Sequence, residues 1–161
     1  MLPEEIKRIL KLAPHPVEGG FFRRTYTSAL TMETERGRRA AGTAIYYLLE
    51  PGTFSEMHML TSDEIFHFYL GDPVEMLQLH PDGRTDVFTF GADIAGGQHV
   101  QLTVPAGVWQ GTRLLAGGKM ALLGCTVTPG FEFAEYASGS YADLAGRWPG
   151  EAERIRALTH N

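Results

Sequence analysis

The sequence predicts one all-β domain over residues 1–161, a sandwich or closed barrel with a short helix at each end. Short apolar runs rich in aromatic and β-branched residues recur through the middle of the chain. Turn residues separate these runs, and 19 glycines are available for tight turns. Strands at roughly ten-residue spacing, with Gly and Pro between them, are typical of sandwiches and barrels. A chain of 161 residues is long enough to bury one core.

The first predicted element is a helix over residues 3–12. Pro3 suits the first turn, where its missing N–H costs nothing, and Glu4 and Glu5 complement the positive end of the helix dipole. Two prolines follow shortly after residue 12 and end the helix. An apolar face at helical spacing is formed by Leu2, Ile6, Ile9 and Leu10.

Strands are predicted from the apolar runs that follow, and several of these runs stop at a strong turn signal such as Pro51-Gly52 or Pro81-Asp82-Gly83. The predicted strands cover residues 21–27, 43–49, 65–70, 74–80, 87–90, 100–104 and 120–128. Residues 36–41 form the best candidate for a mobile loop. A second helix is predicted over residues 151–158, after Trp148-Pro149-Gly150.

Composition and charge exclude several classes of protein. The net charge is −5 and no basic stripe is present, so nucleic acid is not an expected partner. No apolar stretch approaches the ~20 residues of a membrane-spanning helix, and the N-terminus has no apolar signal core. Cys125 is the single cysteine and lies in an apolar run, which indicates a small buried side chain. We expect a cytoplasmic protein that contacts neither nucleic acid nor membranes.

Two stretches carry polar residues at a fixed spacing. Gly52, His58, Glu64 and Gly71 keep the spacing of the first cupin motif, which reads Gly, five residues, His-x-His, three or four residues, Glu, six residues, Gly. Leu60 stands where that motif has its second His. The second cupin motif, Pro-x-Gly followed two residues later by His, resembles Pro105-Ala-Gly107-Val-Trp-Gln110, with Gln110 in place of the His.

Further segments resemble the cupin-5 family, also called domain of unknown function 985. They lie in order along the chain at residues 15–26, 62–69, 104–110 and 129–133. The resemblance implies a cupin double-stranded β-helix, the jelly-roll barrel of the sugar-nucleotide epimerases of the cupin class. It also implies a dimer. It implies no particular activity, because the family has no settled one, and fold alone does not assign function.

A pocket is predicted from the alternation of faces along the strands. Residues two apart share a face, so His58 lies with Leu60, and Glu64 lies with Phe66 and Phe68. In the cupin frame these faces point into the barrel, and Gln110 enters from a third strand. A few polar groups with apolar walls are typical of a small-molecule site. The predicted ligand-binding residues are His58, Glu64, Phe66, Phe68 and Gln110.

The same residues leave the question of a metal open. A full cupin site has three His and one Glu, whereas here Leu60 cannot ligate and Gln110 is a poor ligand for zinc or iron. No cofactor is therefore expected. The alternative is a divalent metal held by His58, Glu64 and Gln110 and completed by water molecules.

Without a metal, His58 and Glu64 remain candidates for acid–base catalysis. A buried carboxylate can fix the tautomer of an imidazole and raise its pKa, and such a pair can abstract a proton beside a carbonyl. A tyrosine, either Tyr47 or Tyr136, would return the proton on the other face. The simpler alternative is that the two side chains only hydrogen-bond each other.

Two neighbouring segments are interpreted more simply. His15 is predicted to be a turn residue before Gly19-Gly20, which permit a sharp bend. Arg23 and Arg24 alternate in direction, so one of them is placed either to meet an anionic ligand or to make surface ion pairs.

Three functional hypotheses follow. The first is a binding protein for a small metabolite such as a sugar or nucleotide sugar. The second is a metal-independent sugar epimerase or isomerase in which His58 is the base and Glu64 orients it. The third is a metal-dependent cupin enzyme. Outer strand faces rich in Phe, Tyr and Met indicate a partner surface, so we expect a homodimer.

Overall fold

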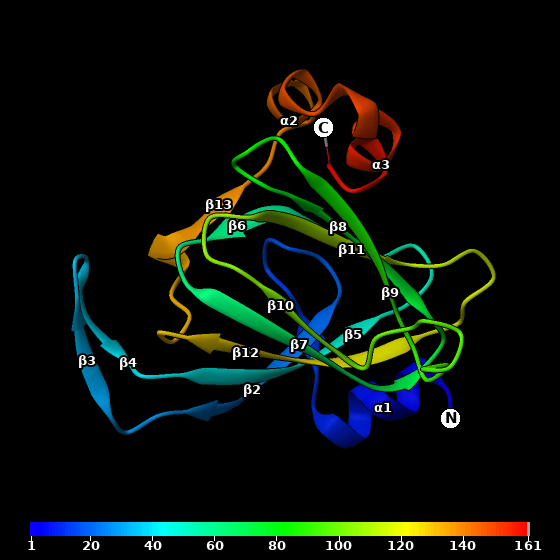
Figure 1. Ribbon diagram of the computed structural model, residues 1–161. Helices are drawn as coiled ribbons and strands as arrows, with labels where there is room; N and C mark the ends of the chain where they lie inside the picture. The colour runs from blue at the N-terminus through cyan, green and yellow to red at the C-terminus, as the bar shows by residue number, and fades with distance from the viewer. Residues whose placement is uncertain (161) are drawn as a thin grey trace.

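Two antiparallel sheets face each other in the computed structural model, which describes residues 1–160 (Figure 1). The predicted domain end at Asn161 lies outside the described residues. The first sheet has the order β1-β2-β5-β12-β7-β10, and the second has the order β13-β6-β11-β8-β9. The strands of the first sheet are β1 (Ala13–Pro14), β2 (Phe21–Thr27), β5 (Thr43–Leu49), β7 (Asp63–Gly71), β10 (Gln101–Val104) and β12 (Ala121–Thr128). Those of the second are β6 (Phe54–Leu60), β8 (Val74–Leu79), β9 (Thr85–Phe90), β11 (Trp109–Leu114) and β13 (Tyr136–Ser138).

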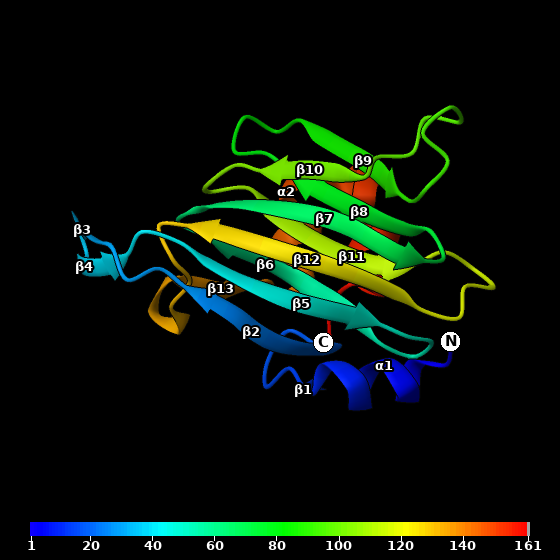
Figure 2. The same ribbon diagram turned by 90° about the horizontal axis from the view of Figure 1, so that it is seen from below.

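Helices cover part of the outer face of each sheet. Helix α1 (Pro3–Leu10) packs on the six-stranded sheet, which Figure 2 shows from below with β5 and β12 between β2 and β7. Helices α2 (Tyr141–Arg147) and α3 (Ala152–Ala157) pack on the five-stranded sheet. Short 3₁₀ segments η1 (Phe133–Glu135) and η2 (Pro149–Glu151) precede β13 and α3. The all-β class with helices at both ends is confirmed.

The apolar core has three parts. The largest lies between the sheets and includes Tyr47, Phe66, Phe90 and Leu123. The second lies under α2 and α3, and Trp109 packs against it, because its strand turns that side chain to the outer face. The third lies under α1. Its buried members are Ile6, Leu48, Met120 and Leu122.

Most predicted strands are confirmed to within two residues, and those over residues 21–27 and 43–49 match their observed bounds. The sequence pattern did not separate β11, β13 or α2, because each is short and its apolar positions are few. The first helix ends at Leu10 rather than residue 12. Lys11 adopts the left-handed conformation, and its N–H caps Lys7 O.

The segment predicted as a mobile loop is a hairpin strand. Residues of β4 (Gly37–Ala40) pair with β3 (Thr31–Thr34), and this arm projects from the barrel (Figure 1). Arg39 is buried and pairs with Glu135 at 2.7 Å, which fastens the arm to the segment before β13. The charged composition of this segment indicated an exposed loop. The strand was missed because the burial of Arg39 depends on a partner almost a hundred residues away.

A bulge changes the faces at the end of β7. Its pairing with β12 shifts between Leu122 and Leu123, so that Phe68 is opposite Leu123 while Tyr69 is unpaired. Phe68 still packs against the inner core, whereas Tyr69 and Leu70 are exposed.

Among the described residues, no helix is long and apolar enough to cross a membrane.

Candidate functional site

A cavity of about 510 Å³ opens between the sheets at the end formed by β2, β5 and the segment before β13. Its polar floor is formed by His58 on β6, Glu64 on β7 and Glu18 in the loop between β1 and β2, and its walls are mainly apolar. The lining residues are His15, Glu18, Phe22, Arg24, Thr43, Ile45, His58, Leu60, Glu64, Cys125, Val127, Phe131, Glu132 and Phe133. The structure thus brings His58 and Glu64 into one site, as the motif spacing predicted.

His58 is fixed in one tautomer and faces the cavity with its other nitrogen. It lies on β6 between β11 and β13 and is 2% exposed. Its Nδ1 is 2.7 Å from the carbonyl oxygen of Glu56. A carbonyl can only accept, so Nδ1 carries the proton and donates it. The Nε2 atom is left facing Glu18 and Glu64, each 4.0 Å away. These distances are too long for hydrogen bonds, so the simple His58–Glu64 bond is absent.

Glu64 is a buried carboxyl group whose proton is held more tightly than usual. Burial raises its pKa from 4.5 to about 7, and the charge of Glu18 acts in the same direction. Opposing these effects are the charge of His58 and hydrogen bonds from Gln110 and Cys125. The side chain is therefore divided between its neutral and charged forms near neutral pH.

Gln110 supports Glu64 and does not itself line the cavity. Its Nε2 donates to Glu64 Oε2, and its Oε1 is buried without a hydrogen-bond partner among the described residues. An amide rotated by 180° would present that oxygen to a protonated Glu64 instead. Gln110 can thus pair with either form of the carboxyl group.

Glu18 is a site residue that the sequence reasoning missed. It lies in the loop between β1 and β2, where Ser55 Oγ donates to its Oε1 and His15 Nε2 lies 3.6 Å from its Oε2. The loop crosses β6 so closely that a Cβ on Gly19 would meet the carbonyl oxygen of Phe54. Gly19 has a φ of 100°, in the left-handed region. The neighbouring Gly19-Gly20 was recognised in the sequence, but it predicted only a sharp bend and not that Glu18 would reach the cavity.

His15 both forms the predicted turn and lines the cavity. Its Nδ1 accepts the N–H of Glu18 at 2.9 Å, so Nε2 carries the proton of the neutral ring. Burial lowers its pKa, which favours that neutral form. The Nε2–H group of His15 therefore faces Glu18 without adding a charge.

The aromatic residues around the cavity differ from the predicted pair. Phe66 is fully buried in the core between the sheets, Phe68 packs against that core, and neither lines the cavity. Three other rings do so, namely Phe22, Phe131 and Phe133. Strand alternation gave Phe66 and Phe68 the correct side of the sheet, but only the three-dimensional fold decides which part of the interior stays open.

Neither candidate tyrosine presents its hydroxyl group to the cavity lining. Tyr136 stacks on His58 with ring centroids 5.0 Å apart and donates to Glu56 at 2.7 Å. Tyr47 is buried and donates to the carbonyl oxygen of Gly19 at 2.6 Å. Burial raises the pKa of both phenols, so both remain protonated. Tyr136 orients His58, and Tyr47 holds the loop that carries the missed glutamate.

The donor set does not fit the four-ligand metal site of a full cupin. Leu60 has no ligating atom, and the amide N–H of Gln110 points at Glu64. Over residues 1–160, no group of three or more His, Cys, Asp or Glu side chains is arranged to hold a metal ion. Cys125 is buried, and burial raises the pKa of its thiol, so it is not a ready thiolate ligand.

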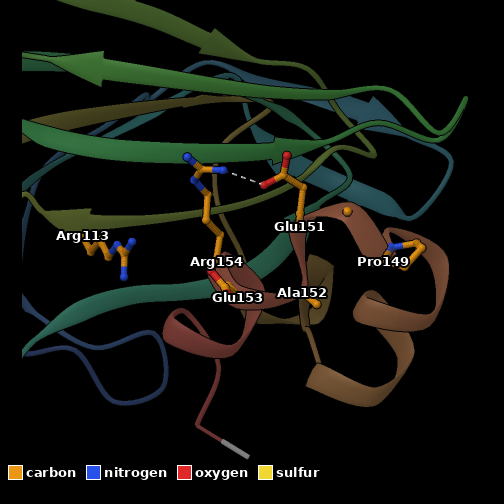
Figure 3. A pocket seen from close by; sticks show the side chains of 7 residues that line it. Arg113, Pro149, Glu151, Ala152, Glu153 and Arg154 are labelled. Atoms are coloured by element: carbon orange, nitrogen blue, oxygen red, sulfur yellow. Dashed lines mark hydrogen bonds and ion pairs between the residues drawn. The ribbon is translucent and has the colours of Figure 1, made fainter.

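A second hollow, of about 570 Å³, lies on the surface beside α3 (Figure 3). Its arginines and Glu151 are already paired. Arg154 contacts Glu151 at 3.0 Å and Glu75 at 3.3 Å, and Arg113 contacts the same Glu75 at 3.4 Å. Figure 3 shows Arg154 and Glu151 reaching toward each other. These pairs hold both arginines and Glu151 on the protein itself, whereas the interior cavity presents buried polar groups to open space, so the interior cavity is the candidate site.

Three similar proteins match most of the chain, two of them by structure and one by sequence. A hypothetical protein from Leishmania major is 30% identical, with a TM-score of 0.91 and coverage of 100% of both chains. Protein SO0799 from Shewanella oneidensis is 30% identical, with a TM-score of 0.90 and coverage of 99% and 98%. The uncharacterized protein YML079W of Saccharomyces cerevisiae is 31% identical over 133 residues, which are 74% of this chain and 66% of the yeast protein.

More distant structures share the fold alone. Oxalate decarboxylase from Bacillus subtilis is 15% identical with a TM-score of 0.57, and the match covers 92% of this chain and 37% of that one. A family model described as Cupin superfamily (DUF985) matches residues 4–138, and the predicted resemblance is confirmed. The chain therefore belongs to the DUF985 family of the cupin superfamily.

Proposed function

We propose that the chain binds a small organic metabolite in the cavity around His58 and Glu64, with sugars as the first class to examine. The observation that carries this proposal is the position of His58 Nε2, which faces an open cavity with Glu18 and Glu64 on either side. Carboxylates and an imidazole nitrogen accept hydrogen bonds from hydroxyl groups. The aromatic rings at the wall offer a flat surface for the apolar face of a sugar.

Charge argues against the nucleotide sugars within that class. A diphosphate would approach the carboxylates Glu18 and Glu64, which repel it. Within residues 1–160, the cavity is lined by a single side chain of the Lys or Arg type, that of Arg24. Its guanidinium already donates to the carbonyl oxygen of Phe131 at 3.2 Å. One exposed arginine is a weak counterpart for two phosphates. Uncharged or cationic metabolites therefore rank above nucleotide sugars.

Thermal unfolding tests the binding proposal. A ligand at 100 times its dissociation constant stabilises the folded chain by ~2.7 kcal/mol, so neutral sugars, amino sugars and nucleotide sugars can be compared by their effect on Tm. A hit should lose its effect in His58→Asn and keep it in Glu153→Gln, which changes only the surface hollow. If no compound raises the Tm of the wild type, the binding proposal is wrong.

A metal-independent isomerase is the second candidate, and the tautomer of His58 favours it. With Nδ1 donating to Glu56, the lone pair of Nε2 points into the cavity and can accept a proton from a carbon beside a carbonyl. Glu64, with its pKa near 7, could then exchange a proton with the intermediate. This role replaces the predicted tyrosine, since both tyrosine hydroxyls are engaged elsewhere.

Exchange with deuterated water separates the isomerase from the binding protein. An isomerase incorporates solvent deuterium at the carbon beside the carbonyl, and NMR follows this incorporation in a keto sugar or aldose. We expect incorporation to stop in His58→Gln, with Glu153→Gln as the control. A compound that binds but gains no deuterium identifies the chain as a binding protein.

The metal-dependent alternative makes a separate prediction. Leu60 and Gln110 replace two of the four usual ligands, which weakens metal binding. We therefore expect the purified protein to contain less than about one metal ion per ten chains. Elemental analysis of wild type beside His58→Asn and Glu64→Gln measures this. Stoichiometric metal that disappears in both variants would establish the metalloenzyme instead.

We also propose a homodimer in a reducing, cytoplasmic compartment. The outer face of the six-stranded sheet leaves Tyr69 51% exposed and Leu70 40% exposed beyond α1, and Tyr46 lies edge-on to Tyr69. Light scattering of the wild type and of Tyr69→Lys tests the dimer. Cell fractionation tests the compartment, for which the buried thiol of Cys125 is the supporting feature.

A further inference from the structure

The floor of the cavity holds more negative charge than its own side chains neutralise. Glu18 and Glu64 both face it, and each lies 4.0 Å from His58 Nε2. One imidazole can neutralise one carboxylate at most, and a cation bound beside Glu64, whose pKa is about 7, would favour the charged form of its carboxyl group. His15 adds no charge, since its Nδ1 accepts a backbone N–H and burial favours its neutral form.

No other lining residue supplies the missing positive charge. Arg24 is exposed and donates to Phe131, and the neighbouring rim residue Glu132 is itself acidic. Glu132 lies 3.9 Å from Arg39, which pairs more closely with Glu135 at 2.7 Å. The floor therefore favours a positively charged group brought by the ligand, because buried carboxylates without a cationic partner are costly.

The walls define the rest of such a ligand. Phe22, Phe131 and Phe133 line the cavity, and the ring of His15 lies tilted against that of Phe22, with the ring centroids 4.7 Å apart. Aromatic faces attract organic cations and also cover apolar surface. Ile45, Leu60 and Val127 add aliphatic surface. A fully hydrated inorganic cation would gain little from these walls.

We infer that the cavity selects a ligand with a protonated amino group on an apolar or ring-shaped body, the amino group lying between Glu18, Glu64 and His58. This inference rests on the proposed binding function and names the charge of its ligand. Within the sugars it selects amino sugars over neutral ones. It places anionic metabolites, including nucleotide sugars, outside the range of ligands.

Matched probes of equal size test the charge. The first set is 2-phenylethylamine, 2-phenylethanol and 3-phenylpropionate, and the second is glucosamine and glucose. Calorimetric titration of the full chain at pH 7 should show the amine binding at least about tenfold more tightly than the alcohol, the usual worth of a charge-assisted contact. The carboxylate should not bind, and glucosamine should exceed glucose.

Isosteric variants locate the amino group. Glu18→Gln should weaken amine binding by about tenfold and change alcohol binding by less than about twofold, because the substitution removes charge and little volume. Glu153→Gln, on the surface hollow, should change neither. Near-UV circular dichroism and the Tm of each unliganded variant establish that it is folded.

The outcomes separate this inference from the proposed function. Equal binding of amine and alcohol, or any preference for the carboxylate, would overturn the charge assignment while leaving the pocket in place. Amine binding that is unchanged in folded Glu18→Gln would also overturn it. If neither probe set nor any sugar binds the wild type, the proposed binding function itself has failed.

Discussion

The interior cavity and the surface hollow beside α3 are similar in volume, at about 510 and 570 Å³, and both contain acidic and basic side chains. They differ in how these side chains are used. In the hollow, Arg154 and Arg113 contact Glu75, and Arg154 also contacts Glu151. In the cavity, His58 Nε2 lies 4.0 Å from each facing carboxylate, which is beyond hydrogen-bond distance.

This difference in charge pairing indicates which of the two regions can act on a ligand. Paired charges on a surface satisfy each other and contribute little to stability or to recognition. Buried groups that face a cavity without close partners are costly, and such a cost is typical of sites that act on a ligand. Matched substitutions, one in the cavity and one in the hollow, can therefore test this difference.

The largest expected difference concerns glycines of the two regions. In Gly19→Ala, the new Cβ would meet the carbonyl oxygen of Phe54, and the residue would keep a positive φ. We expect a loss of about 3–5 kcal/mol in the free energy of unfolding, from strain and steric overlap. Chemical denaturation measures it.

Gly150→Ala is the matched control in the hollow. A Cβ there meets no atom within 4 Å, and the backbone carries no positive φ. Its stability should change by about 0.5 kcal/mol or less. A Gly19→Ala protein as stable as this control would show that the loop does not need its close approach to β6.

The second prediction is a pH-dependent effect of Glu64→Gln. Burial raises the pKa of Glu64 from 4.5 to about 7, so between these values the folded chain binds more protons at this site than the unfolded chain. The stability of the wild type should therefore fall as pH rises from 4.5 through 7. The variant lacks this dependence. Its stability relative to wild type should rise by roughly 3 kcal/mol from pH 4.5 to pH 8.

Urea denaturation of both proteins at several pH values measures the effect. Glu153→Gln, at an exposed position of α3, serves as the control and should follow the wild type at every pH. A wild type that gains stability relative to Glu64→Gln as the pH rises would contradict the buried, proton-holding state of Glu64.

The smallest expected effect is in the surface hollow. Arg154→Ala removes contacts with Glu151 and Glu75, but its side chain is 40% exposed and Arg113 still contacts Glu75. We expect a loss of about 1 kcal/mol or less and no change in ligand binding. Denaturation and calorimetry measure both. A larger loss would mean that the hollow matters more to the fold than its exposure indicates.

The sequence predicted the fold class and the centre of the site for identifiable reasons. Strands over residues 21–27 and 43–49 match their observed bounds, since both runs are rich in β-branched and aromatic residues and the second ends at the turn signal Pro51-Gly52. The spacing of His58, Glu64 and Gln110 brought together residues from three strands, and the structure places them within hydrogen-bond or ion-pair range of one another.

Other features depended on distant parts of the chain. Arg39 looked like a loop residue, yet it is buried against Glu135. Phe66 and Phe68 had the correct parity, yet core packing encloses them while more distant rings line the cavity. A pattern along one strand gives the direction of a side chain. It does not give what lies opposite.

The sequence by itself determined the all-β class, the helices at both ends and the motif that places His58 and Glu64 together, because local periodicity and turn chemistry act over a few residues. Only the tertiary structure decided that Glu18 joins them and that the floor is acidic. That arrangement requires a loop to cross β6 within van der Waals contact of its backbone, and such a contact between distant segments leaves no periodic trace in the sequence.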